Sequence, residues 1–407
     1  MSEILHARVP SASESPMSDR LNSLSSLSSS ILAGAVGSLM FLLTPLFVGS
    51  VADQSSYTSA QAGLLGSADL AGMFLGSVIM ANFIKKIDWR RTAAIALCAF
   101  VILQVLSLGV ERSFAALLCM RILSGVVGVV LMAIAFCHIA STCNPDRNFA
   151  LFIAAQMLLG ALASWVITSL PVEWGVSRIF YFLIAISGLP AFFMGFIPKH
   201  GLEASEKGVQ VVASEISIGS LCLLLVAMFS FGLGIMSVWA FVERIGVGHG
   251  FSASAIGKTL SVSLLASLCG ALIVGVIRNR MGRLLSILLA SGFLFTSSYA
   301  LVAFHDFLVF AASVTVFAFF WTFAAPYQLS LLALADSSGR TIVISLAMIK
   351  IGYAVAPAIG GLISTSGGFE SNILLGMACF VISFLCLSAG SAPSKRISVA
   401  RGHEVDG

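Results

Sequence analysis

The sequence predicts an all-α polytopic membrane protein, with twelve transmembrane helices in two six-helix halves related by a pseudo-two-fold axis. Three observations support this fold class. Of the 407 residues, 58% are hydrophobic and 10% are charged, and the mean hydropathy is +1.02, whereas soluble domains carry about 25% charged residues. Apolar segments of about 20 residues, enough to cross a bilayer as a helix, recur along the chain. A repeated loop pattern divides these segments into two sets of six.

The apolar segments are separated by short clusters of charged, Gly or Pro residues. Each segment is expected to be a helix, because only helices and closed barrels satisfy every backbone polar group in lipid. The expected spans are residues 27–51, 59–83, 92–110, 113–140, 148–170, 179–197, 217–242, 253–277, 284–304, 307–333, 341–365 and 370–391.

The rest of the chain forms tails and one linker. Residues 1–23 are serine-rich and lack the apolar core of a signal peptide, so we expect a disordered cytosolic tail. The two helical bundles are expected over 24–198 and 216–391, joined by a charged cytosolic linker at 199–215. A second cytosolic tail is expected over 392–407.

The distribution of basic residues predicts the orientation in the membrane. With a cytosolic N-terminus, the cytosolic side collects sixteen Lys and Arg residues, and the other side has only Arg112, Arg178 and Arg244. Cytosolic loops carry an excess of Lys and Arg. Both termini and the central linker are therefore expected in the cytosol, with the protein in the cell membrane.

An internal repeat relates the two halves. A shift of 193 residues aligns the loop at 82–91 with the loop at 275–283, and it also aligns Arg147 with Arg340. Parallel repeats of this kind are found in transporters, in which the binding site lies between the halves near the membrane midplane.

These loops resemble the signature G-x-x-x-D-[RK]-x-G-[RK]-[RK] of the major facilitator superfamily. The second copy keeps Gly275, Arg280, Gly282 and Arg283, with Asn279 in place of the acid. The first copy departs from the pattern and keeps only its two last positions, Arg90 and Arg91. The resemblance implies a fold of two six-helix bundles, transport activity, and a role for these loops in closing the cytosolic side.

Two other segments bear on the family's mechanism. Arg121 to Gly125 in span 4 is similar to the family's R-x-x-x-G pattern, whose Arg is associated with proton coupling. Span 5 lacks the G-P-x-x-G-G of the family's antiporters, and a related string runs instead from Gly352 to Gly361 in span 11. This difference weakens an assignment as a drug antiporter.

Three ionisable residues lie deep in the expected spans. Charged side chains in the membrane usually face a partner or a cavity. For Asp69 and Arg121, one interpretation is a permanent buried ion pair that fixes helix packing; the other is that Asp69 takes up a proton when the pair opens. Lys350 has no evident acidic mate in its own half, so it either attracts an anionic substrate or pairs with Asp69 across the halves.

Polar and aromatic residues in the spans are further candidates for contact with substrate. They are Gln61, Gln104, Gln156, Trp321, Tyr327, Gln328 and Tyr353. Pro326 is expected to bend the helix that carries three of them. Glu243, Arg244, His305 and Asp306 lie at loop edges and are expected to be solvated.

The resulting hypothesis is a secondary active transporter of a small organic solute, coupled to protons and working by alternating access. Organic-anion symport is favoured, with drug/proton antiport as the alternative and a non-transporting membrane sensor as the third possibility. The chain lacks a P-loop and the G-x-S-x-G and H-E-x-x-H motifs, so an enzyme, a cofactor and a metal site are not expected. The expected partners are the lipid bilayer, the solute and protons, with no nucleic acid, and a functional monomer is expected.

Overall fold

The computed structural model describes residues 21–53, 57–84, 86–200, 217–277, 280–335 and 340–391. Within these ranges all regular secondary structure is helical. Most of the expected N-terminal tail, almost all of the expected linker, and the expected C-terminal tail lie outside the described residues.

The helices form two groups of six membrane spans. The first group comprises α2 (Leu24–Gly37), α3 (Leu39–Ala52), α4 (Ser59–Phe83), α5 (Trp89–Val110), α6 (Phe114–Ala140), α7 (Pro145–Ser169) and α8 (Ser177–Phe193), with short 3₁₀ turns at Val172–Trp174 and Met194–Phe196. The second group comprises α9 (Ile218–Trp239), α10 (Val242–Gly248), α11 (Ala253–Ile277), α12 (Arg283–Ala303), α13 (Phe307–Ala335), α14 (Arg340–Gly367) and α15 (Glu370–Gly390).

Together the described helices make twelve segments long and apolar enough to cross a membrane, which confirms the predicted fold class. In this count α2 and α3 form one span, and α9 and α10 another. The first span is divided at Ser38, whose hydroxyl donates to the carbonyl oxygens of Gly34 and Ala35 at 3.0 and 3.1 Å. A hydroxyl that bonds to the preceding turn in this way bends a helix. The seventh span is divided between α9 and α10. By contrast, α13 runs through Pro326 as one helix.

Polar caps fix where several helices begin. Thr58 and Gln61 form a reciprocal capping box at the start of α4. At α5, the Asp88 carboxylate accepts from the backbone N–H of Arg91, and this hydrogen bond holds the pKa of Asp88 below its usual value. Gly282, with φ of +80°, turns the chain into α12, a conformation that favours glycine.

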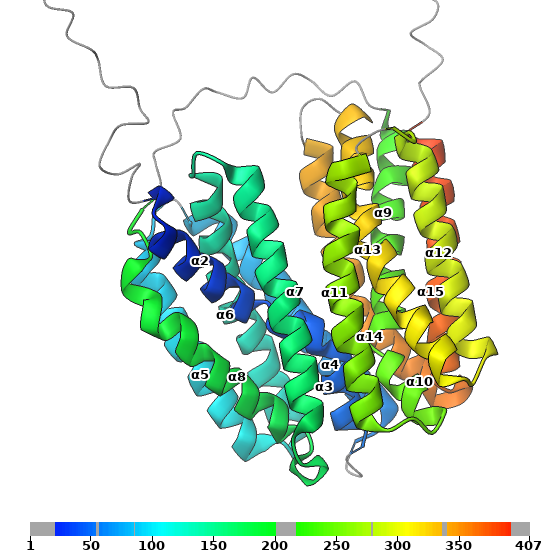
Figure 1. Cartoon of the computed structure of the whole chain (residues 1–407), viewed down its shortest axis with the longest axis horizontal. Coiled ribbons are helices and arrows are strands. Elements are labelled where there is room, and N and C mark those ends of the chain that lie inside the picture. Colours follow the sequence, from blue (N-terminus) through cyan, green and yellow to red (C-terminus); the bar gives the residue numbers. More distant parts are fainter. Residues whose placement is uncertain are drawn as a thin grey trace, which may run out of the picture.

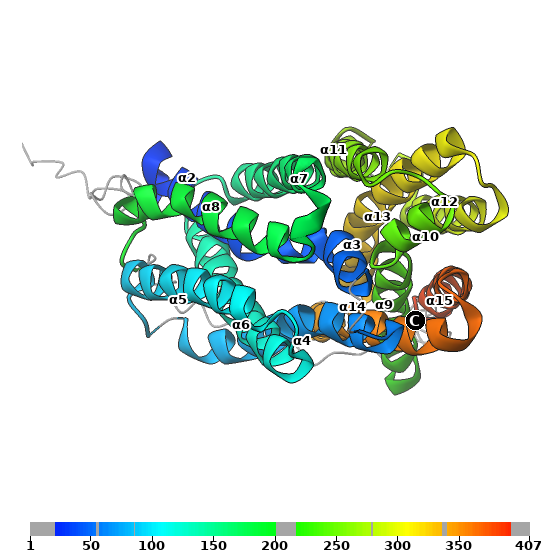
Figure 2. The ribbon, with the colours of Figure 1, turned by 90° about the horizontal axis from the view of Figure 1, so that it is seen from below.

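The two ends of the molecule differ in charge and in packing. We call the end that carries Lys86, Arg91, Arg147 and Lys199 the basic face, and the other end the opposite face. The two bundles diverge toward the basic face, at the top of Figure 1. They meet at the opposite face, where α3, α4 and α7 lie beside α10, α14 and α11 (Figure 2).

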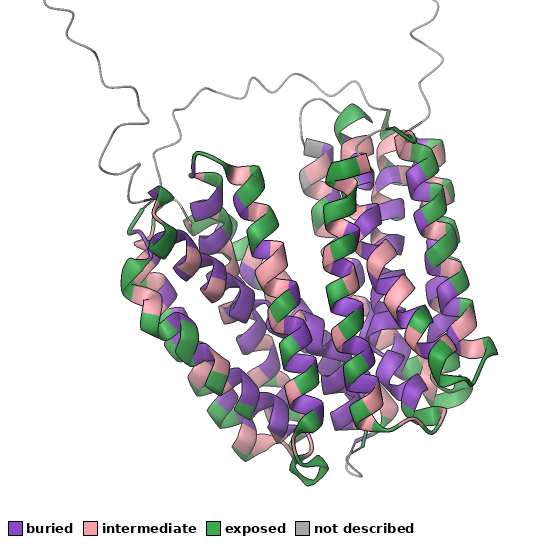
Figure 3. Cartoon of the chain, viewed as in Figure 1, coloured by how far each residue is buried: buried purple, intermediate pink, exposed green. Residues whose placement is uncertain are grey.

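The contact between the halves depends on glycines that allow close helix approach. A Cβ at Gly63 of α4 would lie 2.2 Å from the Pro357 carbonyl oxygen of α14. A Cβ at Gly257 of α11 would lie 1.9 Å from the Thr168 hydroxyl of α7. We call these contacts, with that of Gly49 on Glu243, the glycine seam. The region around the seam is the most continuously buried part of the molecule in Figure 3.

Candidate functional site

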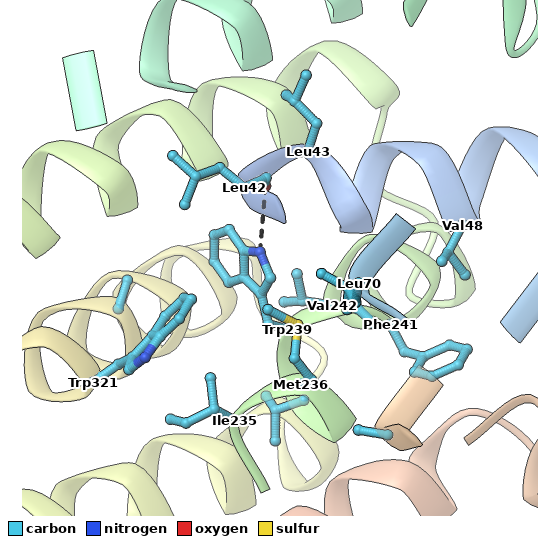
Figure 4. Packing of buried hydrophobic residues seen from close by; sticks show 14 of the residues in the cluster. Leu42, Leu43, Val48, Leu70, Ile235, Met236, Trp239, Phe241, Val242 and Trp321 are labelled. Carbon is cyan, nitrogen blue, oxygen red and sulfur yellow. Dashed lines mark hydrogen bonds between the residues drawn. The ribbon is translucent and has the colours of Figure 1, made fainter. Parts of the chain in front are cut away.

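Aromatic rings from both halves meet in the interior, near the middle of the spans. Phe41 of α3 packs against Trp321 of α13 and Tyr353 of α14, with ring centroids 5.7 and 5.3 Å apart. Trp239 of α9 lies 5.8 Å from Trp321, and its indole N–H donates to the Leu42 carbonyl oxygen at 3.3 Å (Figure 4). We call Phe41, Trp239, Trp321 and Tyr353 the aromatic cluster. These contacts join the first half to the second in the interior.

Polar side chains of both halves lie on the basic-face side of this cluster. In α14, Lys350 is half-buried and precedes Tyr353 by three residues, about 4.5 Å along a helix. In the first span, Ser38 precedes Phe41 by the same number of residues, and its hydroxyl accepts a 2.7 Å bond from Gln156 of α7. A lysine, a serine and an amide therefore stand about one helical turn from the aromatic cluster.

Lys350 has no ion-pair partner in the part of the chain that the structure describes. The interpretation that pairs it with Asp69 is therefore not supported, because Asp69 lies close to Arg121 instead. Lys350 is thus a half-buried lysine without a counter-charge among the residues described.

Two predicted substrate residues face the interior of the second half. Tyr327 is 3% exposed and packs against Phe323, with ring centroids 5.2 Å apart. Gln328 is 1% exposed, and its Oε1 has no hydrogen-bond partner among the described residues. Trp321 and Tyr353 thus meet in the aromatic cluster. Lys350 and Gln156 lie on its basic-face side, one in each half, and Tyr327 and Gln328 are buried within the second half.

Asp69 and Arg121 form a buried ion pair inside the first half. Arg121 Nη1 of α6 lies 3.8 Å from Asp69 Oδ2 of α4, and both side chains are at most 5% exposed. Arg121 Nη2 donates to Gln104 Oε1 at 2.9 Å and to the Ser107 hydroxyl at 2.8 Å, both on α5. Its guanidinium lies 4.8 Å from the centroid of the Phe180 ring. Arg121 is therefore directed into the bundle, away from the aromatic cluster.

The geometry of this pair leaves polar atoms unsatisfied. Asp69 Oδ2 and the Nε and Nη1 of Arg121 are buried without hydrogen-bond partners among the described residues. Burying such groups is costly, so the pair is held by the surrounding packing rather than by ideal contact. Asp69 also lies two residues after Ser67, whose hydroxyl accepts from the Ala358 amide of α14 in the other half.

The predicted gating loop of the first half, at 82–91, is hydrogen-bonded to the end of the same half. Arg90 Nε donates to the Ile197 carbonyl oxygen at 2.6 Å, and the Trp89 amide donates to that of Lys199 at 2.7 Å. Arg91 is 83% exposed and lies 3.8 Å from Asp88.

In the second half, the corresponding loop is joined to α13. Arg283 Nε donates to the Ser330 hydroxyl at 2.5 Å. Arg280 is exposed, and a Cβ at Gly275 or Gly282 would meet nothing within 4 Å. Asn279 lies outside the described residues. In this arrangement neither loop forms an ion pair with the other half among the residues described.

One expectation about charges is wrong. Glu243 and Arg244 are buried, with exposures of 6% and 7%, because α10 turns inward and packs on α3. Phe41, Ser38 and Trp239 were not predicted from the sequence. Phe41 is one of 30 phenylalanines, and no local pattern separates it from those that face lipid.

The fold and these buried sites define the protein as a multi-pass membrane protein built of two six-helix halves with polar groups between and within them. The chain belongs to the major facilitator superfamily, whose family model matches residues 21–339.

Known structures share this fold. The nucleoside transporter NupG, in a single-residue variant, superimposes with a TM-score of 0.70 at 12% identity, covering 89% of this chain and 99% of that one. The D-xylose-proton symporter gives 0.68 at 15% identity, covering 90% and 96%. The human organic anion transporter TETRAN gives 0.63 at 16% identity, covering 89% and 99%. Identities this low show a common fold alone.

One known protein matches part of this chain by sequence. A probable metabolite transport protein of Saccharomyces cerevisiae is 28% identical over 159 residues, which is 37% of this chain. The match spans only 28% of that protein's length.

Proposed function

We propose that the protein is a secondary active transporter that carries a small organic anion across the membrane with protons, by alternating access between its two halves. Lys350 is the observation that carries this proposal. Lys350 is a half-buried cation without an ion-pair partner among the described residues, and it lies one helical turn from the aromatic cluster. Together they provide one charged contact and one planar apolar surface. Binding sites of this kind combine an apolar lining with a few placed polar groups. An aromatic carboxylate fits both features.

The orientation also belongs to this proposal. The basic face, with Lys86, Arg91, Arg147 and Lys199, is the cytosolic side by the excess of positive charge. With this orientation, the two halves diverge toward the cytosol. Substrate reaches Lys350, Ser38 and Gln156 from the cytosol, on the basic-face side of the aromatic cluster.

Replacement of Lys350 by alanine is expected to weaken binding of an organic anion about tenfold to 100-fold, because a charge-assisted hydrogen bond contributes roughly 1.5–3 kcal/mol. Benzoate is the probe and benzamide, its uncharged counterpart, the control ligand. The measurement is ligand-dependent thermal stabilisation of purified protein. Lys258→Ala removes an exposed lysine of α11 and should leave benzoate binding unchanged.

Organic-anion symport and drug/proton antiport predict different results in this assay. The aromatic cluster would also accept a cationic amphiphile through cation–π contact. Drug/proton antiport would be favoured, and organic-anion symport contradicted, if tetraphenylphosphonium stabilises the protein and benzoate does not. Antiport also predicts that tetraphenylphosphonium stabilises the Lys350→Ala variant more than the parent.

Asp69 is proposed as the residue that carries the proton. It lies on α4, the helix that packs against α14 of the other half, so relative movement of the halves changes the surroundings of its carboxylate. Asp69→Asn is expected to abolish accumulation of benzoate driven by a pH gradient in proteoliposomes, while exchange without a gradient continues. Asp88→Asn, at the cap of α5 and far along the chain from the buried pair, is the control. Undiminished pH-driven accumulation in Asp69→Asn would remove Asp69 from coupling.

A further inference from the structure

Two histidine rings lie in contact on the opposite face of the second half. Their centroids are 4.3 Å apart, and the ring planes are tilted by 42°. His249 is the residue that ends α10, and His305 lies in the turn between α12 and α13. Both segments lie at the lower end of the second half in Figure 1. No sequence motif joins the two histidines, so only the folded structure brings them together.

The backbone at His249 is fixed by the way α10 ends. The Phe251 amide donates to the Gly246 carbonyl oxygen at 3.0 Å, and the Gly250 amide donates to that of Val247 at 2.9 Å. Gly250 has a φ of +82°. This pattern is a Schellman motif, which ends a helix and holds its cap residue, here His249.

The backbone at His305 is fixed by the way α13 begins. The next residue, Asp306, accepts from the amides of Leu308 and Val309 at 2.8 and 3.1 Å. A carboxylate that binds these first amides caps a helix. His305 therefore lies directly before a capped helix, and the Asp306 carboxylate is already engaged.

Aromatic packing joins the two segments. Phe251 lies edge-on to the ring of His249, with centroids 5.8 Å apart. It also packs against Phe307 and Phe310 of α13, at 5.4 and 5.3 Å. These contacts hold the end of α10 against the start of α13, and they keep His249 beside His305.

The ring nitrogens of His249 are buried polar atoms. Both Nδ1 and Nε2 have no hydrogen-bond partner among the described residues. A buried donor or acceptor left unpaired costs about 1–3 kcal/mol, and an ion or a water molecule can be its partner. The His305 side chain is exposed, so its ring can turn a nitrogen toward the same point. A ligand bound by one nitrogen of each ring removes this cost.

The surroundings of His249 favour the form of imidazole that binds a metal. Burial lowers the pKa of His249, and His305 lowers it further, while Glu370 acts in the opposite direction. His249 is therefore neutral at neutral pH, and a histidine must be neutral to bind a metal ion. Glu370, the first residue of α15, lies within electrostatic range of His249. Its negative charge favours a cation at this position.

The available donors determine the class of ion. Among the described residues, no three His, Cys, Asp or Glu side chains are grouped to hold a metal, so two imidazoles are the protein's ligands and water completes the set. Imidazole suits Zn²⁺, Cu²⁺ and Ni²⁺, whereas Mg²⁺ and Ca²⁺ prefer oxygen. Two nitrogens in a tetrahedral Zn²⁺ site lie about 3.3 Å apart. Rings whose centroids are 4.3 Å apart reach this separation by rotating.

We propose that His249 and His305 form a binding site for a divalent transition-metal ion, with one imidazole nitrogen from each and water in the other positions. The site lies within the second half and is separate from Lys350 and the aromatic cluster. A bound ion joins the end of α10 to the turn before α13, so it stabilises the second half. The proposal does not depend on the solute or on the coupling ion.

Titration of the purified full-length protein with Zn²⁺ tests the site. We expect Zn²⁺ to bind at neutral pH and to raise the melting temperature. His305→Ala and His249→Gln are each expected to weaken Zn²⁺ binding at least about tenfold, because loss of an outer-shell partner alone costs roughly 10- to 100-fold in affinity. His200→Ala, which removes an exposed histidine near the basic face, should leave binding unchanged. Parent-like Zn²⁺ affinity in both pair variants would overturn the proposal.

Co²⁺ used in place of Zn²⁺ identifies the ligands. Thiolate ligands give bound Co²⁺ an intense near-ultraviolet absorption that imidazole ligands lack. The parent is expected to lack this band and His305→Cys to show it, because the cysteine replaces one ligand of the ion. A thiolate band in the parent would place the metal at a native cysteine and overturn the proposal. No band in a His305→Cys protein that keeps the parent's melting temperature without metal would also overturn it.

Discussion

Gly63→Val is expected to hold the opposite face open and to stop transport. Even a methyl group at Gly63 would lie 2.2 Å from the Pro357 carbonyl oxygen and 2.7 Å from the Gly361 Cα. Backbone atoms cannot rotate away, so α4 and α14 must separate. Overpacking a close contact costs about 3 kcal/mol at the upper end, which corresponds to a population shift of about 100-fold.

The separation can be measured with spin labels at Val172 and Phe304, which are exposed on the opposite face in different halves. The label distance should lengthen in Gly63→Val, and benzoate uptake should fall with it. Gly188→Val is the matched control, since a Cβ at Gly188 meets nothing within 4 Å. An unchanged label distance together with a lower melting temperature would show that Gly63 serves packing alone.

Arg121→Leu is expected to destabilise the first half by about 3–5 kcal/mol, because it leaves the Asp69 carboxylate buried without a counter-charge. Gln104 and Ser107 also lose a donor. The measurement is thermal unfolding of purified protein, in which a clear fall in melting temperature is expected.

The double variant Asp69→Leu with Arg121→Leu identifies the cause. Replacing a buried ion pair by apolar residues is often neutral for stability, so the melting temperature should recover much of its loss. This variant should nevertheless fail in pH-driven accumulation. If the double variant is as unstable as Arg121→Leu, the arginine stabilises the bundle through Gln104, Ser107 and Phe180 rather than through Asp69.

Hydropathy predicted the helices well because the membrane requires a similar apolar length from every span. The expected segment 59–83 coincides with α4, and 253–277 with α11. The division of the first span at Ser38 was not predicted, since it depends on which carbonyl a hydroxyl selects. Hydropathy reports how apolar a segment is and carries no information on local bends.

The candidate functional residues also fall into two groups, those recognised in the sequence and those misjudged from it. Asp69, Arg121 and Lys350 were recognisable because a charge deep in an apolar segment is conspicuous in the sequence alone. Glu243 and Arg244 were misjudged because they lie near the end of a span, where burial depends on contact with α3 of the other half. Such a contact is a property of the assembled halves, and no local pattern reports it.

The Lys199 carbonyl is held by the Trp89 amide at the end of the first half, and this has a consequence for how the two halves associate. Residues 201–216 connect this anchor to the cap of α9 at Ser217, and a chain of that length reaches about 50 Å when extended. This covalent connection keeps each half near the other whatever contact between them breaks. Cohesion at the glycine seam can therefore be modest, and a weak, reversible contact suffices for a partner that never diffuses away.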